Sequence, residues 1–368
     1  MGALLNSGMA SLVIPVLAVF TALVVAGVAL IVAEVNPIEA YQALVEGALG
    51  SRDAIIETLI KTTPFIFVSL GLALAFRGGL FNIGAEGQLF VGSIIAVLIG
   101  YSVSLPAVIH LPLALLGGFV GGAAWAFIPG YLKARTGAHE VITTIMTNFI
   151  ALRIINWLIG SDGPMRASAL NPVPETKAVF ETARLPLLIL DTRLHAGVIL
   201  APIAAAVIFW LLWRTILGFE IRTVGANPSA ARYAGINVER NIILTMMLSG
   251  GLAGFAGGVQ VLGLKPYNFT TGFNVGYGFD SIAVTMLGGL HPFGVVPASF
   301  VFGIMDAGGR LMQLRTRAPI DVLTIIQGLL LMFVAANQII RSLYRIRARA
   351  EEGPVNLGQL WGGERGSE

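Results

Sequence analysis

Long apolar runs, separated by short polar or glycine- and proline-rich stretches, dominate the chain. A helix needs about 20 apolar residues to cross the hydrocarbon core of a bilayer. Ten stretches are candidates: 11–33, 62–77, 83–101, 108–132, 139–160, 195–214, 241–263, 272–290, 293–312 and 319–341. The eighth is the weakest, because its glycine-rich first part favours irregular backbone and only Asp280 to Leu290 is firmly helical. The pattern predicts an all-α, polytopic transmembrane helical bundle of about ten spans.

Composition excludes a soluble enzyme. Hydrophobic residues make up 56% of the chain and charged residues only 12%, against about 25% charged in soluble proteins. The first run is too long for a signal-peptide core and lacks a basic segment before it, so we interpret it as a retained span. Cysteine is absent and the four histidines lie far apart, which predicts no metal site. No basic run interleaved with aromatics indicates nucleic-acid binding.

Basic residues near the span ends predict the orientation, because positively charged loops resist translocation. With both termini in the cytoplasm, the cytoplasmic side collects Arg77, Lys133, Arg135, Arg214, Arg222, Arg232, Arg240 and the arginines of the tail. The outer side then holds nine basic residues, most of them diluted in two long loops, 34–61 and 161–194, while Arg153 and Arg310 lie within spans. We therefore expect one transmembrane domain over 1–350 and a disordered cytoplasmic tail over 351–368.

Two segments outside the spans have distinct compositions. The loop 161–194 contains four prolines and mixed charge, which predicts an irregular external loop. The segment 214–240 contains several arginines and a turn at 225–228, after which 229–234 can form a short helix that Gly235 ends. A short cytoplasmic helix between two spans is suited to contact a soluble partner.

Glycine is used in two patterns. Gly117 and Gly121, Gly118 and Gly122, Gly250 and Gly254, and Gly254 and Gly258 are each four residues apart, the spacing that lets helix backbones approach closely in lipid. This glycine spacing is consistent either with static packing of the helices or with helices that slide during transport. Glycines also cluster at span edges, in 77–88 and 287–294, which is typical of interrupted helices that line a substrate path.

A few polar groups within the spans are candidates for that path. Asn82 is predicted to cap the following helix, which places Glu86 and Gln88 in its first two turns. Glu86 would then either stabilise the positive helix end or line the path. Asn148 suits an interhelical hydrogen bond or a pore equally. The candidate path residues are Asn82, Glu86, Gln88, Asn148 and Asp280.

Other intramembrane charges favour structural roles. Asp306 and Arg310 are four residues apart and are expected to neutralise each other on one helix face. Glu140 is expected near the cytoplasmic interface, whereas Arg153 needs a partner that the sequence does not identify. No phosphate-binding Gly-Lys motif is present, since the four lysines follow Ile, Leu, Thr and Leu. Transport would therefore be passive or powered by a partner, unless a single acid such as Glu86 or Asp280 couples it to an ion.

Three segments resemble the permease subunits of bacterial ABC importers for nucleosides. They are Phe76 to Phe90 (FRGGLFNIGAEGQLF), His139 to Asn148 (HEVITTIMTN) and Gly225 to Asn237 (GANPSAARYAGIN). These permeases belong to the wider group that includes ribose and branched-chain amino acid permeases. The resemblance covers roughly residues 10–345, and the first two motifs are similar to the larger permease of nucleoside systems.

The resemblance implies a set of partners and a coupling site. Two permeases would form the pore in the bacterial cytoplasmic membrane, two cytoplasmic ATPase subunits would bind ATP and Mg²⁺, and a substrate-binding lipoprotein would deliver substrate from outside. This chain would need no cofactor and would have no catalytic residue. The coupling segment would be 220–237, and it would contact the ATPase through Gly225, Asn227, Pro228, Ala230, Ala231, Arg232, Gly235 and Ile236.

Other functions stay open. Ribose-like sugars or branched-chain amino acids are alternative substrates, because those permeases share the architecture. An ion-coupled secondary transporter would not need 220–237 to bind anything, so co-purification of an ATPase through that segment separates the two. A receptor-like membrane protein would transport nothing, and the glycine-interrupted spans count against it.

Overall fold

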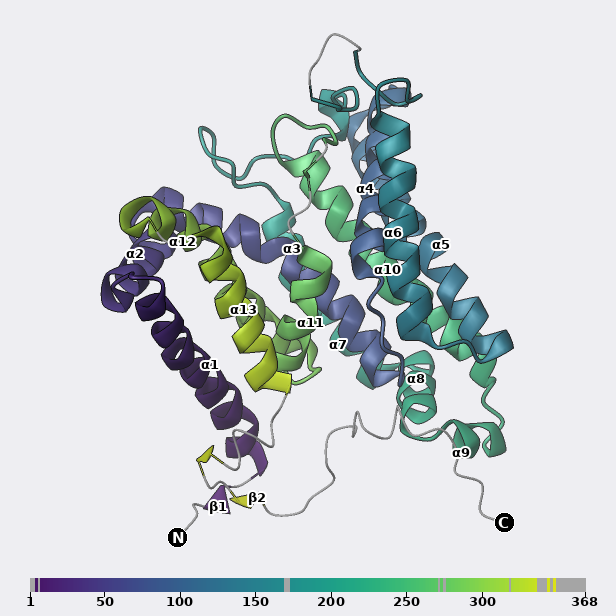
Figure 1. The fold of residues 1–368 in the computed structure, drawn as a ribbon. Coiled ribbons are helices and arrows are strands. Elements are labelled where there is room, and N and C mark those ends of the chain that lie inside the picture. The colour runs from purple at the N-terminus through teal and green to yellow at the C-terminus, as the bar shows by residue number, and fades with distance from the viewer. Residues whose placement is uncertain are drawn as a thin grey trace.

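The computed structural model describes residues 4–5, 7–168, 173–270, 272–273, 276–317, 319–335, 343–344 and 347–348. The predicted tail, 351–368, lies outside these residues. The described chain forms a helical bundle (Figure 1). Its helices are α1 (Ser7–Val32), α2 (Pro37–Leu49), α3 (Arg52–Arg77), α4 (Ala85–Ser102), α5 (Ala107–Thr136), α6 (Glu140–Ile159), α7 (Gly197–Arg214), α8 (Ile216–Ala226), α9 (Pro228–Tyr233), α10 (Val238–Gly263), α11 (Tyr277–Leu287), α12 (Pro292–Thr316) and α13 (Ile320–Ala335). Two-residue strands, β1 (Leu4–Leu5) and β2 (Arg347–Ala348), pair in parallel.

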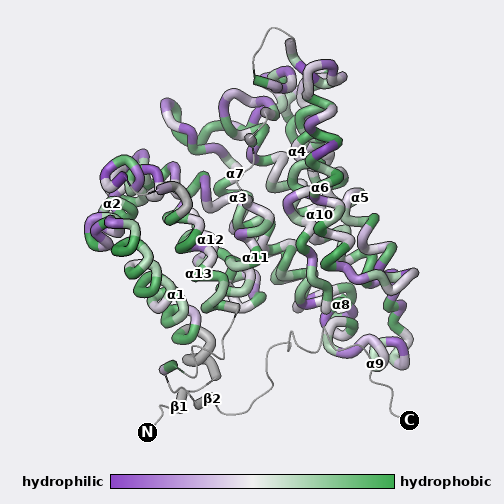
Figure 2. The backbone as a smooth tube through the Cα atoms, viewed as in Figure 1, coloured by the Kyte–Doolittle hydropathy of each residue, from purple (hydrophilic) through white to green (hydrophobic). Residues whose placement is uncertain are grey.

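Each of the ten predicted apolar runs contains a helix, which confirms the all-α, polytopic class. Eight of the described helices are long and apolar enough to cross a membrane, and α11 and α13 are not among them. Hydrophobic residues extend along the helices, whereas hydrophilic ones gather near α2, α9 and the loops at the upper end (Figure 2). The chain is therefore a multi-pass membrane protein.

The predicted outer loop 34–61 is wrong, because most of it is helical. Asn36 caps α2 and Pro37 is its first residue, while Ser51 caps α3, which begins ten residues earlier than its apolar run. These capping residues start helices whose first turns are too polar for a hydropathy pattern to detect. Glu46 of α2 then pairs with Arg315 of α12, and this contact lowers the pKa of the Glu46 carboxyl.

The loop 161–194 is largely irregular in its described part, as predicted. It contains one short 3-10 helix, Glu181–Ala183, and isolated bridges to neighbouring segments. Its backbone is held against the bundle by hydrogen bonds from Phe180 N to Gly100 O and from Leu185 N to Leu262 O, both at 2.9 Å.

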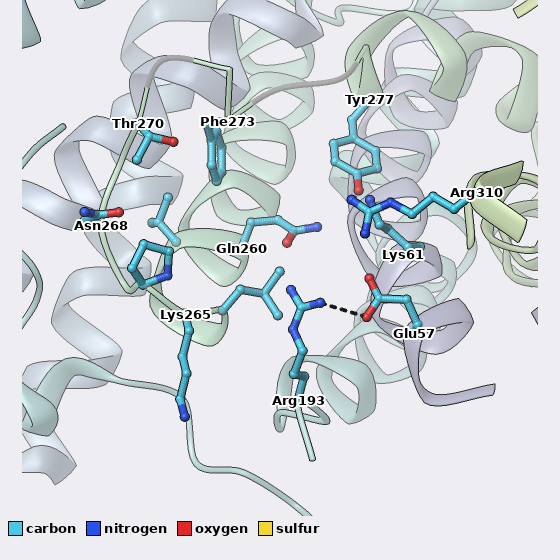
Figure 3. Close-up of a pocket in the computed structure, with 13 residues that line it drawn as sticks. Glu57, Lys61, Arg193, Gln260, Lys265, Asn268, Thr270, Phe273, Tyr277 and Arg310 are labelled. Carbon is cyan, nitrogen blue, oxygen red and sulfur yellow. Dashed lines mark hydrogen bonds and ion pairs between the residues drawn. The ribbon is translucent and has the colours of Figure 1, made fainter. Parts of the chain in front are cut away.

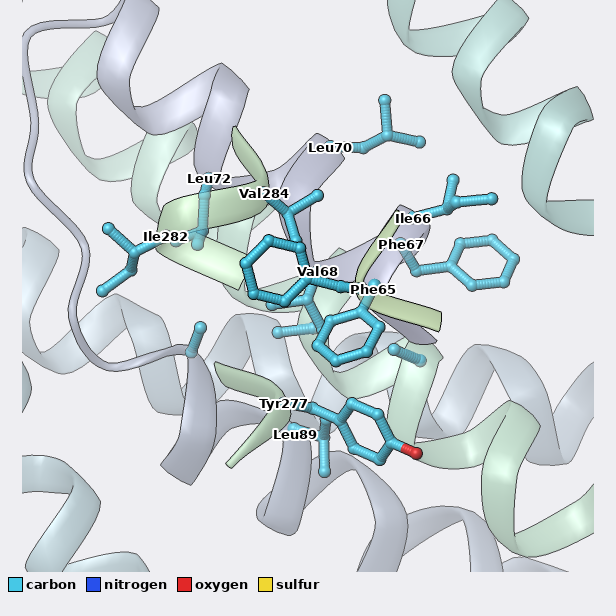
Figure 4. Packing of buried hydrophobic residues seen from close by; sticks show 14 of the residues in the cluster. Phe65, Ile66, Phe67, Val68, Leu70, Leu72, Leu89, Tyr277, Ile282 and Val284 are labelled. Carbon is cyan, nitrogen blue, oxygen red and sulfur yellow. The ribbon is translucent and has the colours of Figure 1, made fainter. Parts of the chain in front are cut away.

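Helix α3 forms the centre of the bundle. Every residue from 62 to 76 is buried, and the helix is apolar on all sides, as expected of a helix enclosed by others. Its aromatic side chains meet α11 and α12: Phe65 packs edge-on against Tyr277 at 4.9 Å and against Phe302 at 5.7 Å between ring centroids. Figure 4 shows this packing around Phe65 and Val284.

The glycine pairs predicted to bring helices together do so between α5 and α10. A Cβ on Gly254 would lie 2.3 Å from Gly118 O, and one on Gly122 would lie 2.2 Å from Gly250 O. Real carbon atoms do not approach that closely, so only glycine allows this crossing. Gly117 instead faces Ile99 of α4. Close packing is thereby confirmed, and sliding stays a hypothesis.

Two helices are interrupted inside the bundle. Helix α3 ends at Arg77, whose Nε donates to Leu290 O just beyond the end of α11. At the other end of α11, Gly278 N donates to the Glu86 carboxylate in the first turn of α4. Arg77 and Glu86 therefore lie at opposite ends of α11, which has 11 residues and is about 16 Å long at 1.5 Å per residue. The start of α4 is thus separated from Arg77 by roughly half the thickness of a membrane. Within the eighth predicted run, the helix expected from Asp280 to Leu290 is found as α11, which begins and ends three residues earlier than predicted.

Candidate translocation and coupling sites

A polar cavity of about 220 Å³ lies between α3, α10, α12 and the residues that follow α10 (Figure 3). It is at the end of the bundle opposite α9, where the loop 161–194 also lies. Its wall consists of Glu57, Lys61, Arg193, Gln260, Val261, Leu264, Lys265, Pro266, Asn268, Thr270, Phe273, Tyr277 and Arg310. The charged groups in this wall come from segments far apart in the sequence.

Two ion pairs form part of the cavity wall and its surroundings. Arg193 Nη1 lies 3.0 Å from Glu57 Oε2, and Lys61 Nζ lies 3.1 Å from Asp306 Oδ2. The second pair corrects the prediction that Asp306 and Arg310 neutralise each other. Asp306 turns across to α3 instead, and among the described residues no carboxylate lies within ion-pair distance of Arg310, which borders the cavity.

The cavity also presents amide and aromatic groups. Gln260 is only 5% exposed and projects toward the centre of the site in Figure 3. Asn268 Nδ2 donates to Glu175 Oε2 at 2.9 Å, while its buried Oδ1 accepts no hydrogen bond from the described residues. Phe273 and Tyr277 add ring faces. Amides beside aromatic rings are suited to bind a flat solute with hydrogen-bonding edges.

Below the cavity, the first turns of α4 and α11 meet at Glu86. Glu86 Oε2 accepts a hydrogen bond of 2.7 Å from Gly278 N, and Asp280 lies in the same first turn of α11. Two helix N-termini carry partial positive charge, which these carboxylates offset. A Cβ on Gly278 would lie 2.3 Å from Glu86 N, so the two backbones are in contact. The arrangement resembles the discontinuous helices that transporters use at substrate sites.

The other three candidate path residues form a buried network between α4, α6 and α10. Asn82 and Gln88 exchange two side-chain hydrogen bonds of 2.9 and 3.0 Å, and Asn82 Nδ2 also donates to Ser249 Oγ. Asn148 Nδ2 donates to Ile83 O, and its Oδ1 accepts from Gly87 N, both at 2.8 Å. These bonds hold the interrupted backbone ahead of α4.

Asn82 is not the helix cap that the sequence predicted. Gly84 precedes α4 without a side-chain cap bond, and Asn82 Oδ1 accepts from Gly84 N instead. The structure thus separates the five path candidates into the network of Asn82, Gln88 and Asn148 and the junction of Glu86 and Asp280. Whether any of them contacts substrate stays a prediction.

At the opposite end from the cavity, α8 and α9 project from the bundle. The prediction of a short helix within 229–234 is confirmed by α9, while α8 adds a helix that the sequence analysis did not identify. Asn227 caps α9 through Ala230 N at 3.0 Å, and Pro228 is its first residue. Gly235 then reverses the chain at φ +82°.

The coupling candidates divide into an exposed and a buried set. Ala230, Arg232 and Gly235 are exposed, whereas Ala231 is fully buried with Val224 and Val238 and is packed by Ile236. Gly225 lies against the end of α3, because a Cβ there would approach Arg77 O to 2.0 Å. The segment is therefore both accessible at α9 and in rigid contact with the spans.

The two charged residues of α6, Glu140 and Arg153, differ in their surroundings. Glu140 begins α6 and pairs with Lys133 at 2.9 Å. Arg153 lies on the exposed side of α6, and the described residues offer it no ion pair.

Most of the cavity is not predicted by the sequence. Glu57 and Arg193 lie in stretches that the apolar pattern predicts as loops, and Gln260 and Tyr277 are not among the predicted site residues. Gln260 was the detectable signal, since an amide near the end of an otherwise apolar run needs a reason. The pairing of residues from α3, α10, α12 and the loop depends on the tertiary fold.

The sequence matches one protein family and is similar to several permeases of known transport systems. Residues 54–335 match the family of branched-chain amino acid transport system / permease components. The guanosine ABC transporter permease protein NupP of Bacillus subtilis (strain 168) is 39% identical over 90% of this chain and 94% of its own. The glucose ABC transporter permease protein TsgB13 of Haloferax volcanii is 34% identical over 90% and 89%, and the nucleoside ABC transporter permease protein NupB of Lactococcus lactis subsp. cremoris is 33% identical over 91% and 94%.

A second permease from two of these organisms is also similar to the chain, at greater distance. NupQ of B. subtilis is 28% identical and NupC of L. lactis is 27% identical, each over 68% of this chain. No solved structure matches the chain.

Proposed function

The chain belongs to the family of branched-chain amino acid transport system / permease components, and from this membership we propose that it is a transmembrane permease subunit of an ABC importer for nucleosides. The observation that supports the substrate is the similarity to a guanosine and a nucleoside permease along nearly the whole chain. The amides and aromatic rings of the cavity agree with a nucleoside, because a base offers a flat face and hydrogen-bonding edges.

In this proposal the α9 end faces the cytoplasm and the cavity faces outward. Substrate enters near Gln260 and Tyr277 and passes the junction of α4 and α11 at Glu86. The outward end would accept substrate from a binding lipoprotein. The location is the bacterial cytoplasmic membrane, as expected for a multi-pass importer subunit with basic residues at the α9 end.

The partners follow from the same proposal. The occurrence of two similar permeases in B. subtilis and in L. lactis supports a heterodimer with a second permease. ATPase subunits would dock on the exposed side of α9, while Gly225 relays their movement to α3 through its contact with Arg77. ATP and Mg²⁺ would bind on those subunits, and this chain would hydrolyse nothing.

Sugar import is the second candidate, because a glucose permease is as similar to the chain as one of the nucleoside permeases. Branched-chain amino acids are less well supported, since the family description alone suggests them. Amide groups in the cavity suit sugar hydroxyls as well as a ribose, so the ring faces of Phe273 and Tyr277 are the feature that favours a base.

Competition uptake distinguishes these substrates. Cells with and without the gene are given radiolabelled guanosine or adenosine, in the presence of excess glucose, ribose or leucine. We expect deletion to remove the uptake and the competitors to leave it unchanged. In a strain without another nucleoside importer, unchanged uptake after deletion would contradict a nucleoside permease, and deletion-sensitive uptake of glucose instead would favour the second candidate.

A further inference from the structure

Two arginines share one indole ring at the end of the bundle that carries α8 and α9. The guanidinium carbon of Arg77 lies 5.2 Å from the centroid of Trp213, and that of Arg222 lies 5.9 Å from it. Each arginine is anchored through one nitrogen: Arg77 Nε donates to Leu290 O and Arg222 Nε donates to Leu212 O, both at 3.0 Å. The Nη groups of both arginines have no hydrogen-bond partner among the described residues.

Among the described residues, neither arginine has an ion-pair partner. The six ion pairs of the described residues involve other basic side chains. Glu220, the carboxylate closest to Arg222 in sequence, accepts instead from Asn241 Nδ2 at 3.4 Å. Arg77 and Arg222 are close enough to repel one another, and both are partly buried. Two like charges in such a place repel one another, and an anion between or beside them would offset that repulsion.

The surroundings match the headgroup level of a bilayer. Trp210 is 59% exposed and Ile216 is 80% exposed on either side of the last turn of α7, and Phe293 of α12 is also exposed. Exposed tryptophan and other aromatics beside basic residues are typical of the membrane–water interface. The His291 ring lies 5.1 Å from Trp213, and burial together with the charge of Arg77 lowers its pKa, which disfavours the charged imidazolium.

We propose that Arg77 and Arg222, beside Trp213, bind the phosphate of an anionic phospholipid. Guanidinium groups present paired N–H donors that fit phosphate oxygens, and these donors are the ones left without a protein partner here. The acyl chains would lie along the exposed apolar face of Trp210 and Ile216. Anionic lipid is abundant at the surface that basic interfacial residues face. The site is separate from the substrate cavity and does not depend on which substrate is transported.

Native mass spectrometry of the full-length chain, purified with its partner subunits in a neutral detergent, tests the site. Phosphatidylglycerol or phosphatidylcholine is added, and bound lipid is counted for the wild type, Arg222→Gln and Arg222→Lys. The control is Arg184→Gln, because Arg184 also lies over an aromatic ring, Tyr267, but has a carboxylate partner in Glu181. Both glutamine variants remove one positive charge.

We expect phosphatidylglycerol to bind more tightly than phosphatidylcholine. Arg222→Gln should weaken phosphatidylglycerol about five-fold, the effect of one basic residue at a membrane surface, while Arg184→Gln leaves it unchanged and Arg222→Lys loses less than Arg222→Gln. Equal binding of the two lipids to the wild type, or an equal loss in the two glutamine variants, would overturn the proposal. Displacement of the lipid by millimolar inorganic phosphate would assign the arginines to a free phosphate and also overturn it.

Discussion

Gly235→Val is expected to uncouple ATP hydrolysis from uptake while leaving the protein folded and inserted. Gly235 follows α9 at φ +82°, and a Cβ there would meet no atom within 4 Å. The cost of the substitution is therefore backbone strain alone, about 1–2 kcal/mol for a left-handed conformation, and more for a β-branched side chain. Such a cost is small beside the stability of a folded domain.

The strain is relieved most easily by moving the turn, and the exposed helix α9 moves with it. A penalty of about 1–2 kcal/mol disfavours the native turn roughly 5- to 30-fold, so the docked arrangement of α9 becomes a minor population. We therefore expect ATP-driven uptake by the reconstituted complex to fall by a comparable factor. The amount of inserted protein should stay near that of the wild type.

Two variants separate this effect from general damage. Gly137 lies at the same end of the bundle with φ +69°, and a Cβ there would also meet nothing within 4 Å. Gly137→Val thus imposes the same strain in a turn outside the α8–α9 segment and should keep most uptake. Gly235→Asn should also keep it, because asparagine tolerates positive φ. Normal transport by Gly235→Val, or an equal loss of uptake in the two valine variants, would contradict a coupling role for α9.

Three further changes test the cavity, the helix junction and the packing. Gln260→Leu should raise the KM for nucleoside uptake about ten-fold and leave insertion unchanged, because the loss of one hydrogen bond costs about 1.4 kcal/mol. An unaltered KM would exclude Gln260 from the path. Glu86→Gln retains an acceptor for Gly278 N but removes the charge, so uptake should fall while thermal stability stays nearly constant, and an equal loss of both would indicate a structural role at the helix end. Gly254→Val should lower the free energy of unfolding by at least about 1–3 kcal/mol, because its Cβ would collide with Gly118 O, and a wild-type melting temperature would contradict the close crossing of α5 and α10.

The apolar pattern predicted the helices well because length and hydropathy are local properties. Its failures have specific causes. Helix α2 and the first part of α3 are too polar to be detected by hydropathy. Asn36 and Ser51, residue types that often cap helices, mark where these helices begin. The predicted Asp306–Arg310 ion pair is wrong because a residue on a neighbouring helix can replace a partner on the same helix face. Asp306 pairs with Lys61 of α3 instead, and the sequence does not reveal that α3 and α12 lie side by side.

The candidate site was only partly predictable, for the same reason. Glu86 and Asp280 were recognised because charges within apolar runs are rare, but their meeting at the start of α11 depends on two interrupted helices. The cavity depends on Glu57, Arg193 and Gln260, which come from three distant segments. The short helix α9 was predicted, since the turn at 225–228 before it and Gly235 after it are local signals.

ATP dependence of nucleoside uptake tests the central claim most directly. A deletion strain that lacks other nucleoside importers is complemented with the wild-type gene or with Gly235→Val, and uptake of radiolabelled guanosine is measured before and after ATP depletion with the proton gradient maintained. A permease subunit of an ABC importer predicts wild-type uptake that stops on ATP depletion and little uptake in the variant. Uptake that survives ATP depletion and follows the proton gradient would contradict it.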